Sequence, residues 1–141
     1  MKWFFDTSVV VSAFVEDHAD HERCLAVYAP SNKRVACCAA HSLAEVYAAV
    51  TRLPGEFRAS PEQAVLFLTD MEEHLTIVSL DSAEYFRAIR QAALNGIVGG
   101  TIYDALLAAC AIKAKAETIY TDDERHFRML GPDIASRVRK P

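Results

Sequence analysis

Several carboxylates in this sequence occupy places where an acid could do chemistry. Asp6 interrupts the apolar run KWFFDTSVVV, residues 2–11, with phenylalanines before it and valines soon after it. Burying a carboxylate in such surroundings is costly unless the charge is paired, hydrogen-bonded or bound to a metal. Asp6 is therefore the first candidate for a functional acid.

Other acids follow apolar segments in a similar way. Glu45 lies in the helical stretch after RVACCA, and Asp104 lies near the start of the apolar stretch TIYDALLAACAIKAKA. Asp122 and Asp123 come directly after TIYT. Functional groups in open α/β sheets gather beyond the carboxyl ends of the strands. A fold of that class can bring all these acids to one edge of the sheet.

The elements that must position these acids alternate along the chain. We expect strands over 2–5, 34–39, 76–80 and 118–121, and helices over 8–16, 20–29, 42–53, 60–75, 81–95, 101–116 and 122–130. Ser60 followed by Pro61 is a strong helix-start signal. Short apolar strands between long helices indicate an α/β sandwich on a mainly parallel sheet, whose strands are buried on both faces.

Composition limits the class of protein. With 141 residues, 52% of them hydrophobic and 24% charged, the chain fits one soluble globular domain spanning 1–141. No apolar run reaches the roughly 18 residues of a membrane helix, and no signal peptide opens the chain, so we expect a cytoplasmic protein with no membrane partner. The net charge of −4 counts against general electrostatic binding of duplex DNA. It does not exclude a nuclease whose acids are concentrated in one site.

The cysteines and histidines give no separate metal motif. The cysteines form no C-x-x-C pair, and Cys37 and Cys38 are neighbours in an expected strand, so their side chains point to opposite faces. We interpret the cysteines as buried thiols in a reducing compartment. His18 and His21 lack clear partner ligands, and we interpret DHADH as a loop or helix start.

Helix capping is the competing explanation for the same acids. Three pairs fit or resemble the capping-box spacing: Ser42–Glu45, Thr121–Glu124 and Thr101–Asp104. Asp6 could cap the helix that starts near Ser8, and Asp81 heads the stretch DSAE. Asp104 fits a cap poorly, because its neighbours are apolar on nearly every face. Position at the end of a strand is therefore not enough to identify the functional acids.

Four motifs in order resemble a known family. WFFDTSV, SLAEVYAAV, GGTIYDALLAACA and IYTDDERHF are similar to the motifs of PIN-domain nucleases, in particular the VapC toxins of bacterial toxin–antitoxin pairs. The resemblance runs from Lys2 to about Phe127. It implies a PIN-like three-layer α/β/α sandwich with a core over about 2–127 and a basic tail over 128–141. It also implies a metal-dependent endoribonuclease that hydrolyses RNA phosphodiester bonds.

The resemblance assigns the catalytic acids residue by residue. Asp6 matches the family's first acid, Glu45 the glutamate after the second strand, and Asp104 the aspartate of the YDALLAA helix. The closing motif, which ends at Phe127, places the fourth acid at Asp123, with Asp122 as the alternative. Asp81 matches no catalytic position, so it returns to the capping interpretation.

Such a cluster predicts a bound cation. Carboxylates in one pocket repel each other unless a cation compensates, and Mg²⁺ or Mn²⁺ prefers oxygen ligands. We expect Asp6, Asp104 and Asp123 nearest the metal, with Glu45 binding through a water or orienting the nucleophile. Supporting hydrogen bonds are expected from Thr7, Ser8 and Thr121.

The resemblance also implies partners. These are an RNA substrate, a small VapB-like antitoxin and a second copy of the chain in a homodimer. The antitoxin groove is expected along 42–75, whose apolar side chains include Val46, Tyr47, Val50, Leu53, Val65, Phe67 and Leu68. Candidates for binding RNA phosphates are Arg87, Arg90, Arg125, Arg128, Arg137, Arg139 and Lys140.

Two alternatives remain open on the sequence. A PIN-like binding module without catalysis would not need all four acids. A haloacid-dehalogenase-type phosphohydrolase would need a second Asp two residues after Asp6, where this chain has Ser8.

Overall fold

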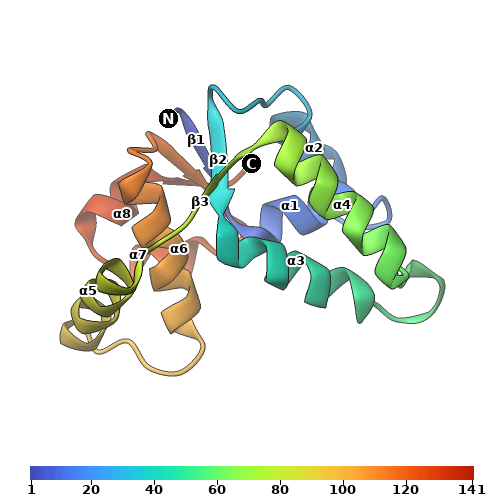
Figure 1. Ribbon diagram of the computed structural model, residues 1–141. Coiled ribbons are helices and arrows are strands. Elements are labelled where there is room, and N and C mark those ends of the chain that lie inside the picture. The colour runs from blue at the N-terminus through green and yellow to red at the C-terminus, as the bar shows by residue number, and fades with distance from the viewer.

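A five-stranded parallel sheet forms the centre of the protein. The computed structural model describes residues 1–141, and its strands lie in the order β3-β2-β1-β4-β5, with every neighbouring pair parallel (Figure 1). The strands are β1 Trp3–Phe5, β2 Ala36–Ala39, β3 Thr76–Val78, β4 Thr118–Tyr120 and β5 Val138–Arg139. The predicted parallel α/β architecture is therefore confirmed.

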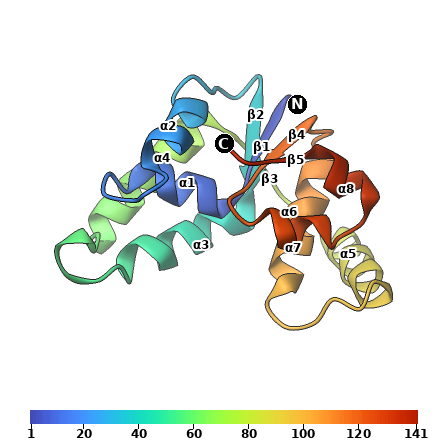
Figure 2. The ribbon, with the colours of Figure 1, turned by 180° about the vertical axis from the view of Figure 1, so that it is seen from behind.

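Helices cover both faces of this sheet. One layer contains α1 Thr7–Phe14, α2 His21–Tyr28, α3 Ala40–Thr51 and α4 Pro61–His74, and the other contains α5 Ser82–Leu94, α6 Thr101–Lys113, α7 Glu124–Arg128 and α8 Pro132–Arg137. Figures 1 and 2 show the two layers on opposite sides of the strands. No helix combines the length and the apolar character needed to cross a membrane.

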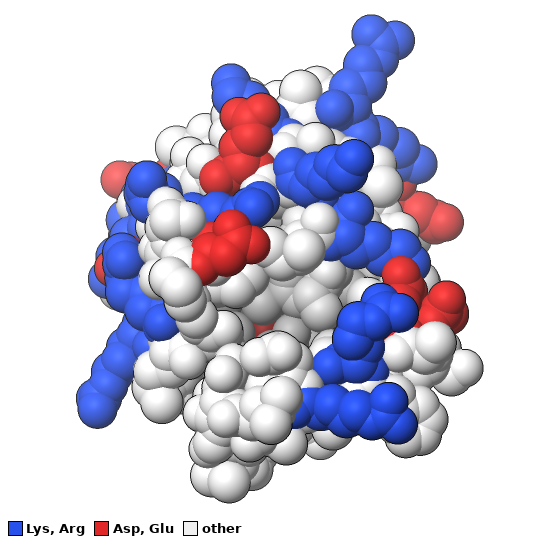
Figure 3. Space-filling view, turned by 90° about the vertical axis from the view of Figure 1, so that its left-hand side faces the viewer, with Lys and Arg blue, Asp and Glu red and all other residues white.

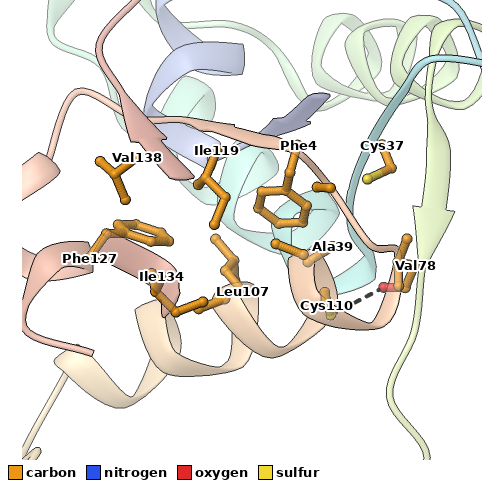
Figure 4. Close-up of a cluster of buried hydrophobic side chains, with 13 residues drawn as sticks. Phe4, Cys37, Ala39, Val78, Leu107, Cys110, Ile119, Phe127, Ile134 and Val138 are labelled. Carbon is orange, nitrogen blue, oxygen red and sulfur yellow. Dashed lines mark hydrogen bonds between the residues drawn. The ribbon is translucent and has the colours of Figure 1, made fainter. Parts of the chain in front are cut away.

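The strands have no polar face because each layer buries one side of them. Phe4 and Cys37 pack into the core beneath α6, α7 and α8, together with Leu107 (Figure 4). Phe5 and Cys38 pack into the opposite core beneath α1 to α4. Alternate residues of one strand therefore enter different cores, as the pleat requires. All four cysteines are buried free thiols, as expected.

Two helix starts follow their predicted capping. Ser60 and Gln63 form a reciprocal capping box at α4, with Pro61 in the first turn. Asp81 and Glu84 form the same box at α5, each side chain accepting from the other's backbone N–H at 2.8 Å. These bonds satisfy helix N–H groups that have no partner inside the helix.

The C-terminal segment contributes to the sheet. The sequence predicts only a basic tail after residue 130, whereas the structure has α8 and then β5, which pairs with β4. Val138 is fully buried, and Arg137 donates to the carbonyl of Ala116 at 2.6 Å. Strand β5 has only two residues, which is too short to give a recognisable alternation.

Candidate active site

The predicted acids lie where the strand order changes direction. From β1 the chain adds β2 and β3 on one side, whereas β4 and β5 lie on the other side. The carboxyl ends of β1 and β4 thus flank a topological switch point, the usual place for a ligand crevice. Asp6 follows β1 directly, and Asp122 and Asp123 come just after β4.

Asp6 is the deepest of these acids. Its residue is only 5% exposed, and its Oδ2 accepts hydrogen bonds from Ser8 Oγ and Thr121 Oγ1, each at 2.7 Å. Burial raises the pKa of Asp6 above its ordinary value, and the two hydroxyl donors oppose that shift. Two of the three hydroxyls predicted to support the acids, those of Ser8 and Thr121, thus donate to this carboxylate.

Glu45 comes to the same edge from α3. Its Oε1 accepts a hydrogen bond from Thr7 Oγ1 at 3.2 Å and lies 3.8 Å from Nε2 of His41. Burial raises the pKa of Glu45, and the charge of Asp6 adds to the rise. The two acids, which belong to different elements, therefore sense each other's charge.

Asp104 links the cluster electrostatically. The pKa of Asp104 is raised to about 6, first by burial and then by the negative charges of Asp6, Asp123 and Glu45. The imidazole of His126, 3.4 Å from its Oδ2, partly opposes this rise. Four carboxylates from four parts of the chain therefore share one electrostatic environment.

The aspartate doublet separates into two roles. Asp122 pairs with Arg23 at 2.7 Å, and its backbone N–H donates to Ser8 Oγ at 3.1 Å. The carboxylate of Asp123 lies 2.7 Å from Nδ1 of His126, next to Asp104. Asp123 therefore lies in the acidic cluster, whereas Asp122 forms an ion pair with Arg23 of α2.

Helix capping does not account for these acids. None of the three capping boxes considered from the sequence forms, and no side-chain hydrogen bond caps α1, α3, α6 or α7. α3 begins at Ala40, directly after β2, so Ser42 lies inside the helix, and its hydroxyl contacts that of Thr7 at 3.1 Å instead. Thr121 uses its hydroxyl on Asp6 and on the backbone N–H of Asp123.

Two histidines that were not predicted from the sequence also lie at this site. His126 contacts Asp104 and Asp123, and His41 lies beside Glu45. His126 is three residues after Asp123, and His41 is four residues before Glu45. Side chains at these spacings lie on one face of a helix. That spacing was a signal in the sequence, although nothing local distinguishes such a pair from an ordinary surface pair.

The donor set fits a hard divalent cation. Ligand atoms of Asp104, Asp123 and His126 all lie within 4.8 Å of one another. The neighbouring Asp6 uses Oδ2 for its two hydroxyl bonds, which leaves Oδ1 without a hydroxyl donor. Carboxylate oxygens are the ligands that Mg²⁺ and Mn²⁺ prefer. Burial is the largest cause of the raised pKa of Asp104, and the negative charges of Asp6, Asp123 and Glu45 add to it.

The basic residues suggested for RNA binding are mostly engaged within the protein. Arg128 pairs with Glu124, Arg137 pairs with Asp133, and Arg139 donates to backbone carbonyls. Lys and Arg nevertheless predominate over Asp and Glu on the side of the molecule shown in Figure 3. Pairing with a helix neighbour leaves such a residue able to contact solvent or a phosphate as well.

Comparisons with known proteins agree on one family. The PIN domain family profile matches residues 3–131. Ribonuclease VapC27 of Mycobacterium tuberculosis is 35% identical over 117 residues, which is 83% of this chain and 82% of that protein. The crystal structure of VapC20 from the same organism, described as a sarcin–ricin loop cleaving toxin, covers 89% of this chain and 92% of its own at a TM-score of 0.73 and 17% identity. The crystal structure of VapBC2 from Rickettsia felis, bound to a DNA fragment from its promoter, covers 99% of this chain and 98% of its own. Its TM-score is 0.65 and its sequence identity is 20%.

Proposed function

This chain belongs to the PIN domain family, among its VapC proteins, and from that premise we propose that it is a metal-dependent endoribonuclease and the toxin of a toxin–antitoxin pair. The observation that carries the proposal is the convergence of Asp6, Glu45, Asp104 and Asp123 at the carboxyl edge, with the pKa of Asp104 raised to about 6. Crowded acids of this kind are expensive to maintain unless they bind a cation.

Each acid has a distinct task in the proposed reaction. Asp6, Asp104 and Asp123 would hold Mg²⁺, or Mn²⁺ in its place. When bound, that ion supplies a more acidic water and offsets the negative charge that develops during phosphodiester hydrolysis. Glu45, whose pKa is raised by burial, orients the attacking water and accepts its proton.

The supporting hydroxyls keep the acids in place. Ser8 and Thr121 fix one oxygen of Asp6, and Thr7 donates to Glu45. These bonds come from α1 and from the residue after β4, so they tie Asp6 and Glu45 to the carboxyl edge of the sheet. Preorganised groups of this kind avoid the cost of reorganisation during the reaction.

The phosphohydrolase alternative is disfavoured by the contact of Ser8. That mechanism requires an aspartate two residues after Asp6, and the hydroxyl of Ser8 instead donates to Asp6 at 2.7 Å. A silent binding module is disfavoured by the cluster itself, because binding without catalysis has no need of four converging acids.

A groove beside α4 suits the proposed antitoxin. Its apolar lining includes Phe14 at the end of α1, Leu53 just after α3, and Leu66 and Phe67 in the middle of α4. Leu66 is 67% exposed, so part of this surface is unprotected. Val46, also considered for the groove, is a fully buried core residue instead, whereas Val50 borders the groove but is itself fully buried. An amphipathic antitoxin segment would bury its apolar side chains here.

The remaining assignments follow the same premise. We propose cellular RNA as the substrate, the cytoplasm as the compartment and a homodimer as the assembly. Sedimentation of the purified protein tests the assembly directly.

RNA cleavage by the purified protein tests the function. We expect cleavage of single-stranded RNA with Mg²⁺ or Mn²⁺, none with EDTA, and none in Asp6→Asn or Asp104→Asn. Asp81→Asn is the matched control, because Asp81 caps α5 and takes no part in the cluster. Metal-independent cleavage, or full activity in either cluster variant, would contradict the proposal.

A further inference from the structure

Two aromatic rings meet across the carboxyl edge of the sheet. His41 in α3 and Tyr103 in α6 stack with centroids 5.2 Å apart and ring planes within 10° of parallel. The two helices belong to opposite layers, so the stack bridges those layers (Figure 1). Tyr103 remains 50% exposed, whereas the phenylalanines of β1 are fully buried.

The stacked pair adjoins the acidic cluster at both ends. Tyr103 immediately precedes Asp104 on α6, and Nε2 of His41 lies 3.8 Å from Oε1 of Glu45. A flat, partly exposed aromatic surface therefore stands next to carboxylates from both layers. Half of the tyrosine surface therefore remains available for a further contact.

We propose that the Tyr103–His41 stack is a platform on which one nucleobase of single-stranded RNA stacks beside the phosphodiester to be cut. The inference rests on the proposed ribonuclease function and adds a substrate contact to it. Unpaired RNA bases are commonly bound by stacking on aromatic side chains, which tolerates any base because every base has a π face.

The platform would also compensate for the unfavourable negative charge of the protein and its reaction site. The chain carries a net charge of −4, and its reaction site is acidic, so phosphate attraction alone is a weak source of affinity. Stacking supplies affinity that does not depend on charge. His41 already holds the tyrosine ring in place, so little side-chain freedom is lost when a base arrives.

Binding of matched oligomers tests the platform. Fluorescence anisotropy in EDTA compares short oligo(A) and oligo(U) with an abasic ribose-phosphate oligomer of equal length and charge. We expect the wild type to prefer the base-bearing oligomers by about tenfold or more, in line with the loss usually seen when a stacking ring becomes alanine. Tyr103→Ala should lose this preference, and Tyr103→Phe should keep it.

Controls separate the platform from folding and from overall function. Phe86→Ala removes another exposed ring, on α5, and should leave the preference intact. Thermal unfolding shows whether Tyr103→Ala folds; if it does not, Tyr103→Leu and His41→Ala replace it, and each should reduce the preference. Steady-state cleavage by Tyr103→Ala should show a raised KM with kcat changed less.

The outcomes are distinct. If the wild type cleaves RNA with Mg²⁺ but shows no preference for bases, or if folded Tyr103→Ala retains the full preference, the platform is refuted and the ribonuclease function stands. If the wild type neither binds nor cleaves any RNA oligomer, both proposals fail.

Discussion

Replacing Asp104 by asparagine should stabilise the metal-free protein at neutral pH. Asp104 faces three other carboxylates, those of Asp6, Glu45 and Asp123, and its pKa is raised from 3.8 to about 6. The folded state therefore disfavours the ionised form that prevails at neutral pH. An asparagine keeps the shape and removes the charge, and the ion-pair contact that it replaces is with His126 Nδ1, 3.4 Å from Oδ2 of Asp104.

The size of the gain follows from the pKa shift of Asp104. A shift of that size corresponds to about 3 kcal/mol of lost stability once both states are ionised, at 1.36 kcal/mol for each pKa unit. The side chain is 25% exposed, and solvent screening reduces the figure to about 1–2 kcal/mol. For a chain of this length that gain raises Tm by about 3–6 °C.

The pH dependence has a definite sign. Because the folded pKa of Asp104 lies above its unfolded value, the stabilising effect is full below about pH 4 and is lost as pH rises through about 6. Raised pKa values of Asp6 and Glu45 act in the same direction. The unfolding free energy of the metal-free wild type should thus fall across this range, and Asp104→Asn should show a shallower fall.

Urea unfolding with EDTA, followed by circular dichroism between about pH 4 and pH 8, measures both effects. Asp81→Asn provides a control that should stay close to the wild type in stability, because asparagine caps a helix as well as aspartate does. The reasoning is refuted if Asp104→Asn is no more stable than the wild type at neutral pH without metal.

Three further predictions concern single contacts. Asp123→Asn should lose more of the Mg²⁺-dependent rise in Tm than Asp122→Asn, since Asp122 is paired with Arg23; the reverse order would move the metal ligand by one residue. Leu66→Glu should leave the fold intact, because Leu66 is exposed, and should weaken binding of a co-expressed antitoxin at least tenfold in a pull-down titration. Unchanged affinity would show that the groove is not part of the antitoxin interface. Thr121→Val should lower the free energy of unfolding in urea by about 1–2 kcal/mol, because it removes a hydrogen-bond donor from buried Asp6. It should also weaken Mn²⁺ binding measured by calorimetry, and wild-type values in both experiments would show that the hydroxyl is dispensable.

The sequence predicted the layers of this fold because its signals are strong and local. Short apolar strands alternate with long helices, and the cap at Ser60 marks a helix start within the residues that form it. The position of Asp6 directly after a central strand was equally visible. What places Asp6 beside Thr121 is the pairing of β1 with β4, which topology supplies.

The remaining features depend on contacts that local spacing does not reveal. The capping boxes at Ser42, Thr101 and Thr121 fit the pattern, but tertiary structure set the helix starts and gave the hydroxyls other partners. The pairing of Arg23 with Asp122 joins residues far apart in the chain, so the doublet could not be resolved from the sequence by physical argument. His126 lies at a local spacing from Asp123, but its contact with Asp104 joins two helices, so the sequence alone did not distinguish it from an ordinary surface residue.

The most direct test of the central claim is the position of a bound metal ion. An anomalous difference map from crystals of the protein grown with Mn²⁺ locates that ion independently of any activity. The account predicts a peak between Asp104 and Asp123 within reach of Asp6, and its loss in Asp104→Asn. Well-diffracting crystals in saturating Mn²⁺ with no peak at this cluster would contradict it.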